Sequence, residues 1–136
     1  MKSIKQLVLF SLLALCSCSE SMSGENEEQI SLIGQWKLEK VCYSDGASSC
    51  GEDKLQIVLF NEVFTFNEDM TMNLVTDNTT CRGTYTYDNK EMLDLNSKDG
   101  NCNFSNTTYR VFDLTANSVT INPPCREACI KTYVRI

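Results

Sequence analysis

The chain has 136 residues, of which 12 are basic and 18 acidic, and its formal net charge is −6. Nucleic acid and anionic phospholipid surfaces both attract positive charge, so this balance argues against either as a charge-driven partner. The chain contains no histidine, which excludes Ser-His-Asp and Cys-His nucleophiles and nearly all catalytic zinc sites. We therefore expect no enzyme, no cofactor and no nucleic-acid partner.

The first 17 residues show the three parts of an export signal. Lys2 and Lys5 supply a positive start, and an apolar stretch follows at residues 7–15, broken only by Ser11. This stretch is too short to span a bilayer as a stable helix, and it ends in small residues and cysteine. We predict that residues 1–17 are a lipoprotein signal peptide.

Two cysteines compete for the cleavage point. Ser17, a small residue, stands before Cys18, whereas the bulky Leu15 stands before Cys16, so that 15–18 resembles a bacterial lipobox. We predict lipidation at Cys18, with acyl chains such as palmitate as the membrane anchor. Each buried CH₂ contributes about 0.8 kcal/mol, so two or three chains anchor a protein durably. The alternatives are an ordinary cleaved signal or a membrane anchor helix.

Residues 18–31 are predicted to form the lipidated terminus and a flexible acidic tether. The segment is rich in glutamate and has almost no apolar residues, and random-coil scaling gives it a span of roughly 20 Å. Cleavage after residue 17 would remove two lysines and no acidic residue, which changes the net charge from −6 to −8. The expected location is the cell envelope, at the outer membrane, facing either the periplasm or the exterior.

Residues 32–136 show short β-branched and aromatic runs with turn signals between them, and no helical periodicity of useful length. Several runs alternate: Met70, Met72 and Leu74 share one face, as do Ile130, Val134 and Ile136. Such half-buried strands are typical of a sandwich or barrel. We predict strands at 34–42, 55–66 (with a bulge at 61–62), 70–76, 81–87, 91–96, 107–114, 118–122 and 129–136.

The connections between these strands alternate in length. Residues 67–69, 88–90 and 115–117 form tight polar turns, whereas the connections at 43–54, 77–80, 97–106 and 123–128 are longer in all but one case. If consecutive strands run up and down, the tight turns and both chain termini lie at one end. The longer loops then form a rim at the other end.

The six remaining cysteines lie in the longer loops or at strand ends beside them. In an oxidising compartment such an even set predicts disulfides, each contributing about 2–4 kcal/mol. Two pairings stay open. The first joins Cys42–Cys129, Cys50–Cys81 and Cys102–Cys125, because first and last strands are neighbours in a closed barrel. The second is local and joins Cys42–Cys50, Cys81–Cys102 and Cys125–Cys129.

Several motifs together resemble the lipocalin-like domain of bacterial lipoproteins. They are Gly34-Gln35-Trp36 on the first strand, Phe64 to Thr71 as a hairpin, Gly83 to Tyr87 with Leu93-Asp94-Leu95, and Tyr133 to Ile136 as the closing strand. The resemblance covers nearly all of 32–136 and implies an eight-stranded antiparallel up-and-down barrel. It also implies that Trp36 packs beneath Arg135. The alternative is that Trp36 is only the largest core residue and Arg135 is solvated.

An eight-stranded barrel either fills with side chains or holds one small ligand. We predict a membrane-anchored, non-enzymatic binding lipoprotein, with a small apolar ligand at the barrel mouth and Trp36, Phe64, Phe66 and Tyr85 as candidate binding residues. The alternative function is a protein-interaction or enzyme-inhibitor module that uses the rim. The wider set of residues for the interior, which could equally pack solidly together, is Trp36, Phe64, Phe66, Tyr85, Tyr87, Met70, Met72 and Phe112.

Overall fold

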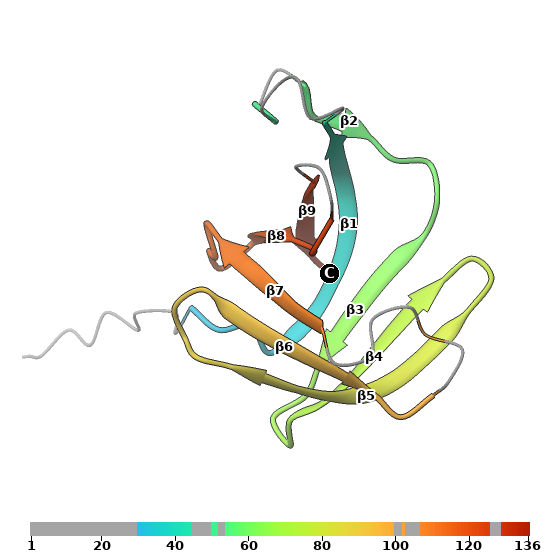
Figure 1. The fold of residues 1–136 in the computed structure, drawn as a ribbon, viewed down its shortest axis with the longest axis vertical. Helices are drawn as coiled ribbons and strands as arrows, with labels where there is room; N and C mark the ends of the chain where they lie inside the picture. The colour runs from blue at the N-terminus through green and yellow to red at the C-terminus, as the bar shows by residue number, and fades with distance from the viewer. Residues whose placement is uncertain (1–29, 45–49, 52–53, 100–101, 103–106, 126–128) are drawn as a thin grey trace, which may run out of the picture.

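The protein folds as a closed antiparallel β-barrel (Figure 1). The computed structural model describes residues 30–44, 50–51, 54–99, 102, 107–125 and 129–136. Cys18 and most of the predicted tether lie outside the described residues. The strands are β1 (Gly34–Tyr43), β2 (Gln56–Ile57), β3 (Glu62–Phe66), β4 (Thr71–Thr76), β5 (Thr80–Tyr87), β6 (Met92–Ser97), β7 (Thr107–Phe112), β8 (Ser118–Asn122) and β9 (Cys129–Arg135).

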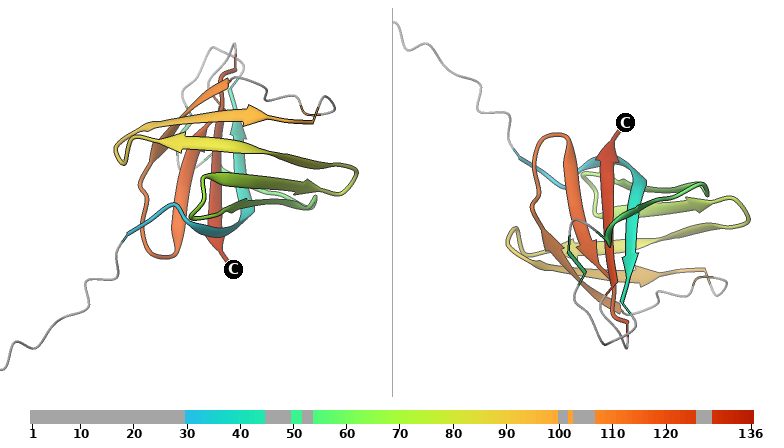
Figure 2. Two further views of the ribbon diagram at one scale, coloured as in Figure 1. Left: turned by 90° about the horizontal axis from the view of Figure 1, so that it is seen from below. Right: turned by 90° about the horizontal axis from the view of Figure 1, so that it is seen from above.

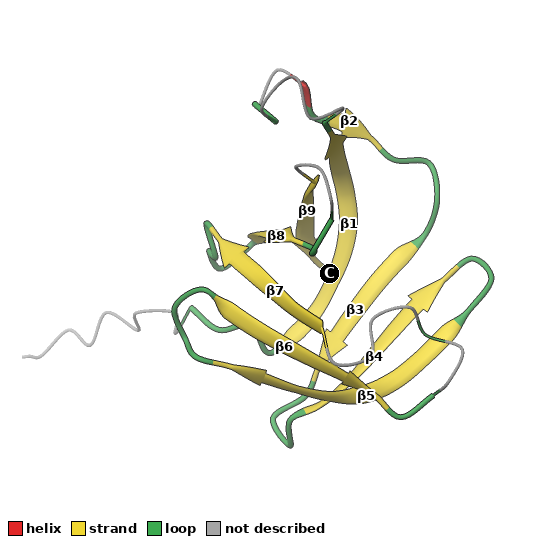
Figure 3. Ribbon diagram, viewed as in Figure 1, coloured by secondary structure: helices red, strands yellow, loops and turns green. Residues whose placement is uncertain are grey.

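Eight of these strands form the barrel and β2 is a short addition to it. From β3 to β9 each strand pairs with the next in the chain, and β1 pairs with both β3 and β9, which closes the ring. Apart from a helical turn at Lys54, the regular structure of the described residues consists of strands (Figure 3). The predicted all-β, up-and-down barrel is confirmed.

The second predicted strand is broken in two. β2 pairs with Lys40 and Val41 of β1, and β3 pairs with residues 34–37. After a bond from the Val58 N–H to the Glu39 carbonyl (3.1 Å), residues 59–61 leave the ladder. The Asn61 N–H turns to the Asp77 carboxylate (3.1 Å), and β1 itself has an irregularity between Leu38 and Lys40 at this level. The prediction of one strand with a bulge at 61–62 was therefore wrong in extent.

The alternation predicted that Met70 and Met72 share one face. In the structure Met70 does not lie on the inner face with Met72. It lies in the turn between β3 and β4, where its φ of 62° and its N–H bond to the Asn67 carbonyl (3.2 Å) close the hairpin. Its side chain is 53% exposed. Turn geometry therefore overrides the apolar pattern at this position.

The barrel has two distinct ends, here called the floor and the rim. The floor carries the turns at 67–70, 88–91 and 113–117, together with the entry of β1 and the end of β9, which meet as the pair Trp36 and Arg135. The rim carries the other connections, between β1 and β3, β4 and β5, β6 and β7, and β8 and β9 (Figure 2). This arrangement agrees with the predicted alternation of connections.

Three disulfides staple the rim, in the local pairing: Cys42–Cys50, Cys81–Cys102 and Cys125–Cys129. The pairing that joined Cys42 to Cys129 was wrong for a reason of register. Cys42 lies opposite Ile130, and Cys129 lies opposite Tyr43. Because neighbouring residues of a strand point to opposite faces, the two cysteines face different sides of the sheet.

The core is one apolar cluster inside the barrel. Among the described residues it begins with Leu32, just before β1. Its largest fully buried members are Trp36, Tyr133, Phe66, Met72, Leu93, Leu95 and Ile121.

Candidate functional site

The floor of the barrel is sealed by Arg135. Its guanidinium carbon lies 4.2 Å from the centroid of the Trp36 ring, and Trp36 is fully buried. Arg135 also donates three hydrogen bonds to backbone carbonyls, at 2.6 Å to Ala116, 2.7 Å to Ile33 and 2.7 Å to Ser31. The stack implied by the family resemblance is confirmed, and the alternative of a solvated Arg135 is wrong.

Gly34 makes room for this seal. A Cβ atom at Gly34 would lie 2.4 Å from Nη1 of Arg135, and the residue has a φ of 132°. The backbone conformation requires glycine here, and a Cβ atom would in addition displace the guanidinium. The Trp36 indole N–H donates to the Leu32 carbonyl (2.7 Å). The segment before β1 is therefore hydrogen-bonded both to Trp36 and to Arg135.

The four candidate ligand-binding residues form a packed layer above the floor. Phe64 stacks on Phe66 with ring centroids 5.4 Å apart, and Tyr85 meets Phe66 edge-on at 4.9 Å. Together with Trp36 they are all buried, and the Tyr85 hydroxyl donates to the Asn67 carbonyl (2.9 Å). The structure therefore brings these residues together as core.

Phe112, one of the wider set, faces outward and is 37% exposed. It lies opposite Thr120, a groove-lining residue of the outer surface, which places it on the outside of the barrel. Its assignment to the interior was wrong. Val111, its neighbour on β7, is buried and faces inward, so Phe112 faces outward.

A polar cluster lies in the rim half of the barrel. Glu62 is only 7% exposed, and its Oε1 accepts hydrogen bonds from the Tyr133 hydroxyl (2.6 Å) and from Nζ of Lys131 (2.8 Å). Its Oε2 accepts from the same ammonium at 2.9 Å. A buried charge is tolerated only when it is paired and hydrogen-bonded, and this carboxylate is both.

Tyr109 faces this cluster from β7. Burial, and then the negative charge of Glu62, raises the pKa of Tyr109 to about 12, and burial followed by the same carboxylate raises the pKa of Tyr133 well above its ordinary value. Both phenols are therefore protonated at neutral pH and can donate hydrogen bonds. The Tyr109 hydroxyl has no hydrogen-bond partner among the described residues.

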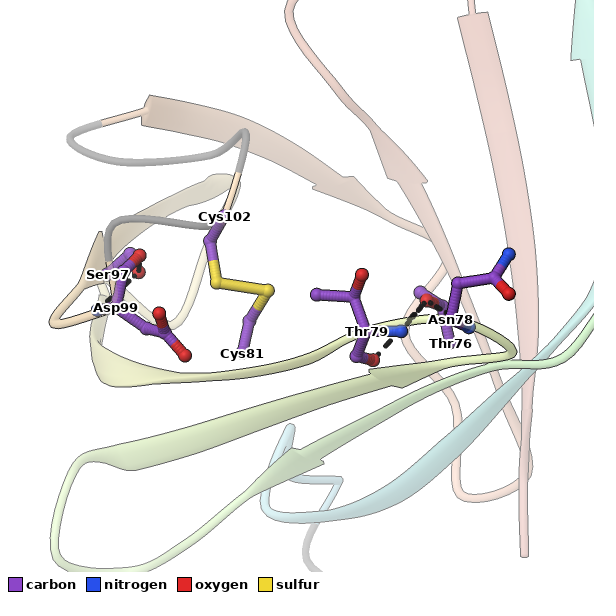
Figure 4. The surroundings of a disulfide bond; sticks show 7 residues. All are labelled: Thr76, Asn78, Thr79, Cys81, Ser97, Asp99 and Cys102. Atoms are coloured by element: carbon purple, nitrogen blue, oxygen red, sulfur yellow. Dashed lines mark hydrogen bonds between the residues drawn. A yellow bond between two sulfur atoms is a disulfide. The ribbon is translucent and has the colours of Figure 1, made fainter.

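The Cys81–Cys102 disulfide ties the connection between β6 and β7 to the inner wall of the barrel (Figure 4). Both sulfur-bearing residues are buried. The adjoining turn is braced by Ser97, whose hydroxyl donates to the Asp99 carbonyl (2.7 Å) and accepts from the Asp99 N–H (3.0 Å). The rim half therefore holds both the polar cluster and a buried disulfide.

Sequence reasoning missed Glu62, Lys131 and Tyr109. The signal that could have found Lys131 is its spacing on β9, where Lys131, Tyr133 and Arg135 share one face. That face is inward, since Tyr133 is buried and Arg135 covers Trp36.

Comparison with family models, with curated proteins and with solved structures finds no match for this chain. In the described part of the chain, no group of three or more Cys, Asp or Glu side chains is placed to hold a metal ion. Among those same residues, no helix has the length and apolar character needed to cross a membrane.

Proposed function

We propose that this protein is a lipid-anchored, non-enzymatic binding protein of the bacterial cell envelope. It holds one small, largely apolar molecule in the rim half of the barrel, through a polar group that meets the Tyr109 hydroxyl. The observation that carries this proposal is the division of the interior. The floor half is packed with aromatic rings, whereas the rim half holds the polar cluster and a phenol without a described partner.

The position of the chain ends supports the anchoring geometry. The first described residues enter at the floor, where Ser31 and Ile33 bond to Arg135. With acyl chains on Cys18 and a tether of roughly 20 Å, the floor faces the membrane and the rim faces away from it. The resemblance of 32–136 to lipocalin-like domains supports a binding role as well.

Native mass spectrometry of the protein, purified from the membranes of its own host, tests the binding proposal. We expect a bound small molecule on the wild type, and much lower occupancy on Tyr109→Phe, which removes only the hydroxyl. Tyr87→Phe is the matched control, because the Tyr87 hydroxyl donates to the Lys90 carbonyl (3.2 Å) in a floor turn. A wild type that carries no ligand, or equal occupancy in both variants, would refute the proposal.

The anchor has its own test. Metabolic labelling with palmitate should mark the wild type and Cys16→Ala, whereas Cys18→Ala should stay unlabelled, because Cys18 follows the small Ser17 and Cys16 follows the bulky Leu15. Label retained in Cys18→Ala would refute lipidation at this residue.

A second function, a protein-interaction or enzyme-inhibitor module, is favoured by exposed apolar side chains at and near β2. Leu59 is fully exposed, Ile57 is 74% exposed and Phe60 is 44% exposed. Exposed apolar patches on monomers often mark interaction sites. In the same mass spectra, a captured protein in place of a small molecule would favour this second function.

A further inference from the structure

A groove of about 520 Å³ crosses the outside of the barrel over β8, β9 and β1. It is separate from the rim half of the interior, because its lining side chains alternate with the buried ones along each strand. Thr120 lies between buried Val119 and Ile121, and Thr132 precedes buried Tyr133.

The base of this groove is one row of residues that face each other across the strands. Thr120 pairs with Thr132, and Thr132 pairs with Lys40. The row continues to Phe112 at one end and to Ile57 at the other. Neighbouring strands lie about 4.8 Å apart, so about 14 Å separates β7 from Lys40 on β1.

An apolar wall rises along the groove at the Lys40 end. The Cys42–Cys50 disulfide holds Cys50 to β1, and Leu55 lies directly before β2. Leu55 and Ile130 line this part of the groove. The wall is held by the disulfide at Cys50 and by the β1–β2 pairing that begins directly after Leu55.

The two ends of the groove carry opposite charges. Lys40 lines one end, and its ion pair with the adjacent Glu39 is long (3.8 Å) and exposed, so it contributes little. Asp113 lines the other end and makes no ion pair with a described residue. Between them the two threonine hydroxyls can donate and accept hydrogen bonds.

We propose that this outer groove binds a short extended peptide with free ends, about four residues long. Four extended residues span about 13 Å, close to the distance of about 14 Å along the sheet from β7 to Lys40. The carboxylate of the peptide pairs with Lys40, its amino group pairs with Asp113, and its backbone bonds to Thr120 and Thr132. Leu55 contacts its side chains. This inference goes beyond the proposed function and does not depend on it.

The test uses the full chain, with ¹³C-labelled methyl groups on isoleucine and threonine. The probe is a randomised tetrapeptide pool with free ends, titrated to about 10 mM total peptide, the weak end of the range for so small a ligand. The comparison probe is the same pool, N-acetylated and C-amidated. We expect the methyl signals of Ile130, Thr120 and Thr132 to shift with the free pool only.

Single substitutions then locate the charges. Lys40→Ala and Asp113→Asn should each weaken binding about two- to fivefold, the range for an exposed ion pair. Lys37→Ala is the matched control, since Lys37 is exposed on the same strand and does not line the groove. Absence of shifts, equal shifts with the blocked pool, or unchanged binding in Lys40→Ala would each overturn the proposal.

Discussion

Replacement of Arg135 by alanine should destabilise the barrel by about 3–4 kcal/mol. The stack on a buried Trp36 contributes about 0.5–2 kcal/mol. The three charge-assisted hydrogen bonds to carbonyls would add about 1.5–3 kcal/mol each if fully shielded, but water can replace much of this near the exposed Ile33. Arg135→Lys should lose more than half as much, because one ammonium cannot reach three carbonyls and the ring together.

Urea unfolding followed by far-ultraviolet circular dichroism and by fluorescence measures this change. Trp36 is the only tryptophan of the chain, so the fluorescence reports on the floor itself. Arg82→Ala is the control: Arg82 is exposed on β5, and its loss should change stability by less than about 0.5 kcal/mol. If Arg135→Ala behaves like this control, the guanidinium does not seal the floor and the reasoning is refuted.

Three further predictions concern the rim half. Glu62→Gln and Lys131→Met should each lower the free energy of unfolding by about 3–5 kcal/mol, because each leaves the charge of its partner buried. The double variant should lose less than the sum of the two, and additive losses in urea unfolding would contradict the ion pair. In an absorbance titration at alkaline pH, Tyr109 should ionise near pH 12, and ionisation near pH 10 would contradict its burial. The stability that the buried, protonated phenol contributes is complete below pH 10, the pKa of tyrosine in the unfolded chain. This contribution is lost as the pH rises towards 12. Replacing Cys81 and Cys102 together by alanine should lower the free energy of unfolding by about 3 kcal/mol. Removing either of the other disulfides should cost less, because they close loops of 8 and 4 residues and this one closes 21. A loss equal to or smaller than theirs would contradict this order.

The strands and their order could be predicted because their signals are local. Alternating side chains and short polar turns define each hairpin, and the tight turn at 88–91 is built by Asp88, whose carboxylate accepts three backbone N–H bonds, at 2.8–2.9 Å. Such information lies within a few residues of sequence. The position of Cys129 one step out of register with Cys42 depends on how two distant strands align, and local patterns do not determine it.

The polar cluster could not be predicted for a related reason. On β9 the apolar residues Ile130 and Val134 suggest an inner face, yet the inner face carries Lys131 and Tyr133. These two are stable inside only because Glu62, 69 residues earlier than Lys131, offers a carboxylate. Hydrophobicity alone therefore assigns the wrong face wherever a distant partner compensates a buried charge.

The closure of β1 on β9 also has a consequence for how the chain can be connected. The Ile136 N–H bonds to the Gln35 carbonyl (3.0 Å), so the last residue lies beside the start of the first strand. A linker of a few residues would join Ile136 to the residues just before β1, and new ends of the barrel could then be opened in a rim connection. Circular permutation should therefore leave the ring of strands intact, because pairing rather than chain order holds it closed.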